Sequence, residues 1–180
     1  SNGNGIDVTG NLTFTGSGSL TVSSISYNGI TVSGNIHFAQ TGKVTVNTNY
    51  GAAIYCNGAV TIDGSLSATS VANGMGVFSK NTLTMNSGKI ATTLEDDHLS
   101  DKGGYDATAL RVDAGSSAVI NGGTIENICD FTSAIENYGT VVVNDAKITA
   151  IHTAVYNGGT MTINGGSVSC GMNGTTRHTI

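Results

Sequence analysis

The stretch AAIYCNGAVTIDGSL, residues 52–66, decides the fold because the chain repeats it. Its second half, VTIDGSL, begins at Val60 and returns four times. The later copies are LTMNSGKI from Leu83, AVINGGTI from Ala118, VVVNDAKI from Val141 and MTINGGSV from Met161. Successive copies begin 23, 35, 23 and 20 residues apart. A period of 20 to 23 residues, with one long interval, is typical of a solenoid built from stacked coils.

The first half of the stretch recurs once in each period, as AAIYCNG, MGVFSKN, TALRVDAG, SAIENYG and TAVYNGG. Looser versions of VTIDGSL occur earlier, as NLTFTG (11–16), GITVSG (29–34) and KVTVNT (43–48). Apolar and polar residues alternate, turns fall on Asn-Gly and Gly-Gly, and no segment has helical spacing. The pattern predicts an all-β fold, a right-handed, single-stranded parallel β-helix (solenoid). We expect about seven to eight coils of 20–23 residues and one inserted loop at about 94–107.

Equivalent residues of stacked coils should form ladders along the solenoid axis. Two inward ladders are expected, Ile62, Met85, Ile120, Val143 and Ile163 in one strand and Ile54, Val77, Leu110, Ile135 and Val155 in another. A turn ladder should bring Asn side chains together, so that their amides hydrogen-bond from coil to coil: Asn86, Asn121, Asn144 and Asn164. The absence of proline fits, because each inner strand donates hydrogen bonds to its neighbours.

Composition excludes several classes of function. The chain of 180 residues is most simply a single domain, 1–180, and no run of 18 apolar residues could insert into a membrane. A net charge of −5 argues against nucleic acid and anionic lipid as partners. The three cysteines have unrelated spacings without CxxC, so we interpret them as small core residues.

Three of the repeated phrases, TINGGSV, VINGGTI and AIYCNGAVTIDG, resemble those of right-handed parallel β-helix proteins of the pectate-lyase-like type. They look most like repetitive extracellular surface proteins of bacteria that are adhesin-like or carbohydrate-binding. This resemblance implies secretion or display on the bacterial cell surface, and contact with glycans. The closing phrase GMNGTTRHTI further suggests a domain excised from a longer secreted or surface protein.

A candidate binding surface follows from the alternation of side chains. If Ile54 and its equivalents point inward, their neighbours point outward. One outward column would be Tyr55, Phe78, Arg111, Glu136 and Tyr156. The column beside it would contain only small residues, Ala53, Gly76, Ala109, Ala134 and Ala154. A column with aromatic ends and a charged middle, beside a flat shelf of small residues, would suit a polysaccharide or a host or cell-surface glycan. The alternative is ordinary cross-strand pairing.

The stretch LEDDHLSDKGGYDATALR, residues 94–111, interrupts the repeat. Its residues 94 to about 107 are the insertion and should form a rim beside this surface, whereas TALR is back in register as a coil strand. Four of its residues join the candidate ligand-binding set: Asp97, Asp101, Lys102 and Tyr105. The segment matches neither the EF-hand pattern nor the calcium-binding nonapeptide. We therefore expect no metal site and no cofactor, with Ca²⁺ as the open alternative because carboxylates are dense here.

The leading hypothesis is a non-catalytic, extracellular glycan-binding or adhesin-like module. A polysaccharide lyase or glycoside hydrolase on the same fold is the first alternative, with Arg111 or Lys102 as base, or Glu136 with Asp97 or Asp106 as the acid pair. The Gly-His-Gly and Arg-x-Pro-x-x-Arg patterns of such enzymes are absent. Ice binding is another alternative, on an outward column of Thr61, Thr84, Val119, Val142 and Thr162 continued by Thr31 and Thr45. A structural spacer is the last.

Overall fold

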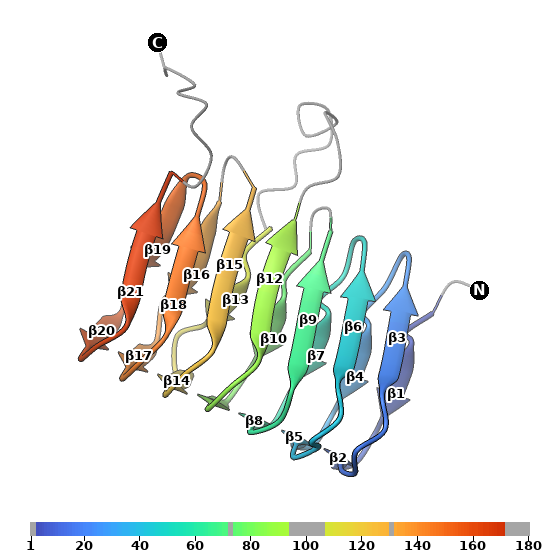
Figure 1. Cartoon of the computed structure of the whole chain (residues 1–180). Coiled ribbons are helices and arrows are strands. Elements are labelled where there is room, and N and C mark those ends of the chain that lie inside the picture. The colour runs from blue at the N-terminus through green and yellow to red at the C-terminus, as the bar shows by residue number, and fades with distance from the viewer. Residues whose placement is uncertain (1–2, 72–73, 94–106, 130–131, 172–180) are drawn as a thin grey trace.

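The computed structural model describes residues 3–71, 74–93, 107–129 and 132–171, which form 21 β-strands and no helix. The strands make three parallel sheets of seven strands each. Each coil contributes one strand to each sheet in turn, so the chain winds into a β-solenoid of about six turns. In Figure 1 the front strands run upward, the chain returns behind them, and it advances from right to left, which makes the coil right-handed.

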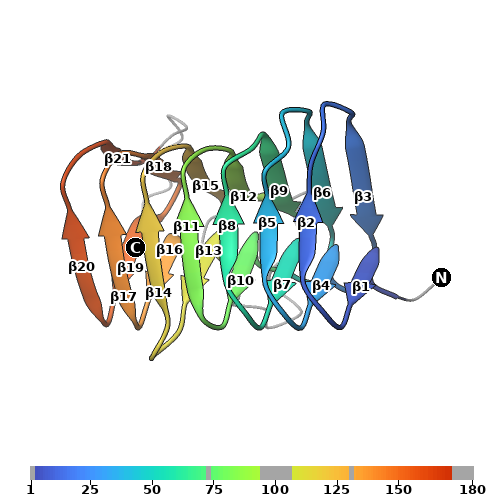
Figure 2. The ribbon, with the colours of Figure 1, turned by 90° about the horizontal axis from the view of Figure 1, so that it is seen from below.

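The first sheet contains β1 (Ile6–Val8), β4 (Ile30–Val32), β7 (Ile54–Cys56), β10 (Val77–Ser79), β13 (Leu110–Val112), β16 (Ser133–Asn137) and β19 (Thr153–Asn157). The second sheet contains β2 (Leu12–Phe14), β5 (Ile36–Phe38), β8 (Val60–Ile62), β11 (Thr82–Met85), β14 (Ser117–Ile120), β17 (Thr140–Val143) and β20 (Thr160–Ile163). The third sheet contains β3 (Leu20–Ser24), β6 (Val44–Thr48), β9 (Leu66–Ser70), β12 (Lys89–Thr93), β15 (Thr124–Ile128), β18 (Lys147–Ala150) and β21 (Ser167–Cys170). Figure 2 looks onto the second sheet, with β2 and β20 at its opposite ends.

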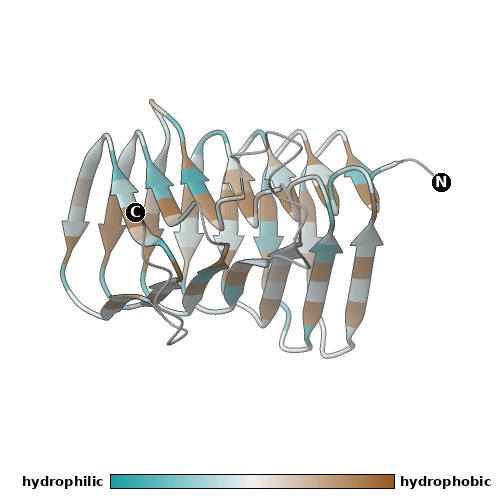
Figure 3. Cartoon of the chain, turned by 90° about the horizontal axis from the view of Figure 1, so that it is seen from above, coloured by the Kyte–Doolittle hydropathy of each residue, from teal (hydrophilic) through white to brown (hydrophobic). Residues whose placement is uncertain are grey.

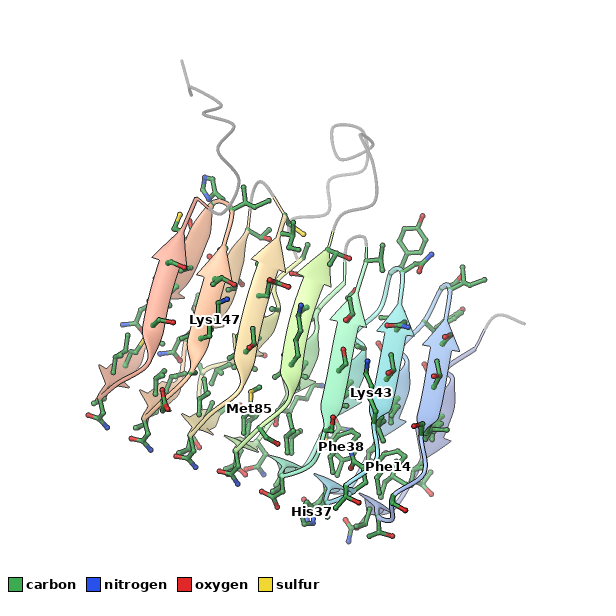
Figure 4. The ribbon with its side chains drawn as sticks, in the orientation of Figure 1. Phe14, His37, Phe38, Lys43, Met85 and Lys147 are labelled. Atoms are coloured by element: carbon green, nitrogen blue, oxygen red, sulfur yellow. The ribbon has the colours of Figure 1, made fainter. Side chains whose placement is uncertain are left out.

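The core is a continuous apolar column inside the three sheets. Alternate residues of the strands point inward, and Figure 3 shows the resulting bands of apolar and polar residues along the arrows. Both predicted inward ladders are confirmed by the strand register and by burial, except in the last coil, where Val155 is half-buried and Ile163 is 49% exposed. Near the N-terminal end the rings of Phe14 and Phe38 stack at 5.0 Å between centroids (Figure 4).

The predicted Asn ladder is confirmed at the corner between the second and third sheets. Each Nδ2 donates to the Oδ1 of the preceding coil, at 2.7 Å for Asn121 to Asn86, Asn144 to Asn121 and Asn164 to Asn144. Asn86 donates in the same way to Asp63, which also pairs with His37 Nε2 at 2.7 Å. The ladder therefore runs unbroken from His37 to Asn164. At the same corner Gly88 has a φ of 87°, a left-handed backbone that favours glycine.

The structure differs from the predicted coil in two details. From β1 to β19 the chain makes about six complete turns, slightly fewer than the seven to eight coils expected. The phrases GITVSG and KVTVNT are not early copies of VTIDGSL, because they form β4 of the first sheet and β6 of the third. Strands β4 (Ile-Thr-Val) and β6 (Val-Thr-Val) have nearly the same alternation as Val60-Thr61-Ile62 of β8, and the sequence alone does not assign such a triplet to a sheet.

Candidate functional site: a ladder on the first sheet

The register of the first sheet places the five predicted outward residues in one column. Tyr55 pairs with Phe78, Phe78 with Arg111, Arg111 with Glu136, and Glu136 with Tyr156. We call these five residues the first-sheet ladder. Because neighbouring strands are roughly 4.8 Å apart, the ladder extends roughly 19 Å from Tyr55 to Tyr156. The insertion ahead of β13 does not disturb this column, since Arg111 lies in register between Phe78 and Glu136.

Aromatic rings form the N-terminal end of the ladder. The rings of Tyr55 and Phe78 lie 5.4 Å apart between centroids and are tilted by 51°. The Nζ of Lys80 lies 5.1 Å from the centroid of the Tyr55 ring, a cation–π contact. Both rings are half-buried, so this end presents an apolar surface beside a single ammonium group.

Opposite charges balance one another in the middle of the ladder. Arg111 Nε donates to Asp113 Oδ1 at 2.8 Å, and Arg111 Nη1 lies 4.0 Å from Glu136 Oε2. The guanidinium carbon lies 5.4 Å from the centroid of the Tyr138 ring. The Asp113 and Glu136 carboxylates and the Tyr138 ring thus hold the guanidinium in place and offset its charge. The cluster therefore attracts an acidic ligand less strongly, while its polar groups can form hydrogen bonds with hydroxyl groups.

A second aromatic pair forms the C-terminal end. The rings of Tyr138 and Tyr156 lie 5.8 Å apart, tilted by 54°, and the two residues are 40% and 50% exposed. Loss of hydration raises the pKa of the Tyr138 phenol above its ordinary value of 10.0, and the carboxylate of Glu136 acts in the same direction. The hydroxyl therefore stays protonated at neutral pH and can donate a hydrogen bond.

The predicted shelf of small residues is wrong. Ala53, Ala109 and Ala134 are fully buried, and Ala154 is only 7% exposed. These residues lie at the corner where the chain enters the first sheet from the third, and there two successive side chains point inward. A Cβ at Gly76 would lie 2.6 Å from the Ile90 side chain, inside the core. The small residues thus allow the chain to turn tightly at this corner, and they do not form an exposed surface.

A second outward column lies instead on the other side of the ladder, just beyond the strand ends. Lys80, Asp113 and Tyr138 directly follow β10, β13 and β16, and the backbone N–H groups of Lys80 and Tyr138 bond to the preceding coil. The sequence interpretation missed these three residues because it placed them in turns. The phrases SKN, VDAG and NYG carried the signal, since each puts a large or charged residue at an equivalent turn position.

Asn127 lies at the corner between the third and first sheets, where the strands that carry the charged middle of the ladder begin. Its Nδ2 donates to the carbonyl of Ala107, which leads into β13, and to the carbonyl of Ser133, which begins β16, at 2.9 and 2.7 Å. It also donates to Thr132 Oγ1 at 2.8 Å, and its Oδ1 accepts from the N–H of Cys129 at 2.6 Å. Asn127 is fully buried. It therefore ties together the two strands that carry Arg111 and Glu136.

Polar residues occupy this inward position in the third sheet from β3 to β15, whereas β18 has Ala150 there. Thr48 donates to the carbonyl of Tyr27 at 2.6 Å, and Ser70 donates to that of Gly51 at 3.1 Å, each in the preceding coil. Asn127 occupies the equivalent position of β15, since it pairs with Thr92, which pairs with Ser70. A larger amide replaces the hydroxyl at the coil that follows the insertion.

Other predicted residues divide into two groups. Asp97, Asp101, Lys102 and Tyr105 lie outside the described residues.

The Thr/Val column of the second sheet is in register as expected, but Thr31 and Thr45 lie on the first and third sheets. The residues that continue the column are Thr13 and His37. A histidine therefore interrupts the uncharged face that ice binding assumed.

No protein-family model, curated protein or solved structure matches the chain. The described residues include no group of three or more His, Cys, Asp or Glu side chains placed to hold a metal ion. None of the described segments is a helix able to span a membrane.

Proposed function

We propose that the protein is a non-catalytic, extracellular glycan-binding module of the adhesin-like kind, and that the first-sheet ladder binds the glycan. The observation that carries this proposal is the in-register column itself. Together with the neighbouring column of Lys80, Asp113 and Tyr138, it places two aromatic pairs and a compensated charged cluster on one face of a rigid scaffold. Aromatic faces pack against the apolar faces of sugar rings, while fixed polar groups take their hydroxyls.

The geometry favours an extended chain over a single sugar. The ladder is roughly 19 Å long and follows five neighbouring strands of one sheet, so successive sugar units can lie along it. The exposed rings of Tyr138 and Tyr156 offer the largest stacking surface. The surface display and bacterial origin in this proposal rest on the repeated phrases and their resemblance to surface proteins.

A glycan array followed by calorimetry on the best ligand tests the proposal. The test variant is Tyr138→Ala/Tyr156→Ala, and its matched control is Tyr27→Ala/Tyr50→Ala. Tyr27 and Tyr50 are 50% and 56% exposed, but they lie between the third and first sheets, away from the ladder. Loss of two rings worth about 0.5–1.5 kcal/mol each should weaken binding roughly 5- to 150-fold.

The control should bind the glycan as the unmodified chain does. Equal affinity in the test variant and the control would show that the glycan lies elsewhere on the molecule. Absence of binding to every glycan on the array would remove the proposed function altogether.

A further inference from the structure

The first-sheet ladder and the column beside it carry their aromatic rings in two separate pairs. The rings of the first pair belong to β7 and β10, and those of the second pair belong to β19 and to the residue after β16. The middles of the two pairs are therefore three strand spacings apart, or roughly 14 Å along the sheet. Strand β13, which carries Arg111, lies between them. A ligand that contacts both pairs must be extended and must cross this charged strand.

Both pairs are held in place by contacts within the protein. Lys80 Nζ lies 5.1 Å from the centroid of the Tyr55 ring in the first pair. In the second pair the Arg111 guanidinium carbon lies 5.4 Å from the centroid of the Tyr138 ring. The same ring lies against Gly158, where an added Cβ would be 3.3 Å from Tyr138 Cδ1. Rings that are positioned before a ligand arrives lose little side-chain freedom when it binds.

The rings within each pair do not lie in one plane. The angle between the ring planes is 51° for Tyr55 and Phe78, and 54° for Tyr138 and Tyr156. Neither pair can therefore lie flat against a planar surface such as the face of a polysaccharide crystal. The two rings of a pair can each stack on a sugar unit when successive units of a single chain are turned relative to one another. The tilt thus favours a dissolved single chain.

The charges of the ladder and of the column beside it cancel. Two of these side chains are positive and two are negative: Lys80, Arg111, Asp113 and Glu136. The whole chain has a net charge of −5. These side chains therefore provide no net positive field that would attract an acidic polysaccharide. A neutral chain needs no such field, because its hydroxyl groups can form hydrogen bonds with the carboxylates and the guanidinium.

We infer that the ligand is a single, dissolved, neutral polysaccharide chain with equatorial hydroxyl groups, and that it must reach both ring pairs to bind with full affinity. This inference rests on the proposed function. Equatorial hydroxyl groups leave C–H groups on both faces of a sugar ring, and these are the faces that aromatic rings cover. Unbranched β-1,4-linked chains of glucose or xylose have this chemistry.

Calorimetry with unbranched β-1,4-linked oligomers of glucose and of xylose tests the required length. A disaccharide covers one ring pair, whereas a hexasaccharide is long enough for both. The hexasaccharide of at least one of the two sugars should bind about 5- to 150-fold more tightly than its disaccharide, because two further rings contribute. In Tyr138→Ala/Tyr156→Ala this difference should disappear, while the disaccharide should still bind at the first pair and so show that the variant is folded. Equal affinities of the two oligomers for the unmodified chain, or an unchanged difference in the variant, would overturn the inference.

Two further probes test the charge and the single chain. The hexasaccharide of β-1,4-linked glucuronic acid differs from the glucose hexasaccharide by a carboxylate at C6 of each unit, and it should bind more weakly. Microcrystalline cellulose presents the glucose chain in flat sheets, and it should not retain the protein in a pull-down. Tighter binding of the uronate chain, or retention on the crystalline polymer, would contradict the inference.

The outcomes separate this inference from the proposed function. Binding of another glycan on the array, with no binding of either the glucose or the xylose oligomers, would overturn the inference and leave the proposed function standing. Absence of binding to every glycan would remove both.

Discussion

Replacing Asn127 with alanine should be among the most damaging single changes outside the apolar core. The side chain is fully buried and makes four hydrogen bonds at the corner that carries the chain into β16. Alanine removes both the donor and the acceptor without offering a replacement. The interior corner is closed to the solvent at this point, since Cys129 is 1% exposed and Ser133 is 6% exposed.

The magnitude follows from the groups that lose their partner. The carbonyl of Ala107 keeps a second donor, because Thr132 Oγ1 bonds to it at 2.7 Å. The carbonyl of Ser133 and the N–H of Cys129 each lose the bond to Asn127. A buried polar group that loses its bond costs about 1–3 kcal/mol, so two such groups should lower the free energy of unfolding by about 2–6 kcal/mol.

Urea unfolding followed by circular dichroism measures this change. Asn121→Ala is the matched control, because it also removes an amide from a ladder, but at an exposed corner where the loss should stay below about 1 kcal/mol. Asn127→Asp should destabilise at least as much as Asn127→Ala, since it places a carboxylate oxygen against two carbonyls. A loss for Asn127→Ala no larger than that of the control would refute the reasoning.

Two further predictions concern the stacking of coils. A hydrogen bond from Asn86 and, to a smaller extent, one from His37 hold the pKa of Asp63 below its ordinary value of 3.8. As the pH falls, the Asp63 carboxyl is therefore protonated at a higher pH in the unfolded chain than in the folded chain. The free energy of unfolding should fall as the pH drops below about 4, and in urea titrations Asp63→Asn should make it depend less on pH. Gly42→Ala would place a Cβ 2.0 Å from the carbonyl oxygen of Gly18, and should lower the free energy of unfolding by about 1–3 kcal/mol. Gly10→Ala meets nothing within 4 Å and should change it by less than about 0.5 kcal/mol; equal losses in the two variants would contradict the close packing of coils.

The repeat predicts the ladders because every coil meets the same environment. A side chain that suits the inside of one coil suits the equivalent position in the next. The sequences around Met85 and Ile120 can therefore be aligned directly, and the two residues are partners in neighbouring strands. The insertion did not hide the register, because TALRVDAG resumes the pattern of the neighbouring coils. The fold was therefore predictable from one sequence, down to the pairing of Arg111 with Glu136.

The errors come from the corners, where alternation stops. Period two assigns Ala109 to the outside because Leu110 points inward, yet the chain bends there and both are buried. Tyr138 directly follows β16, yet its side chain lies beside the ladder and contacts both Arg111 and Tyr156. Corner geometry depends on three sheets meeting at an angle, which no local pattern encodes.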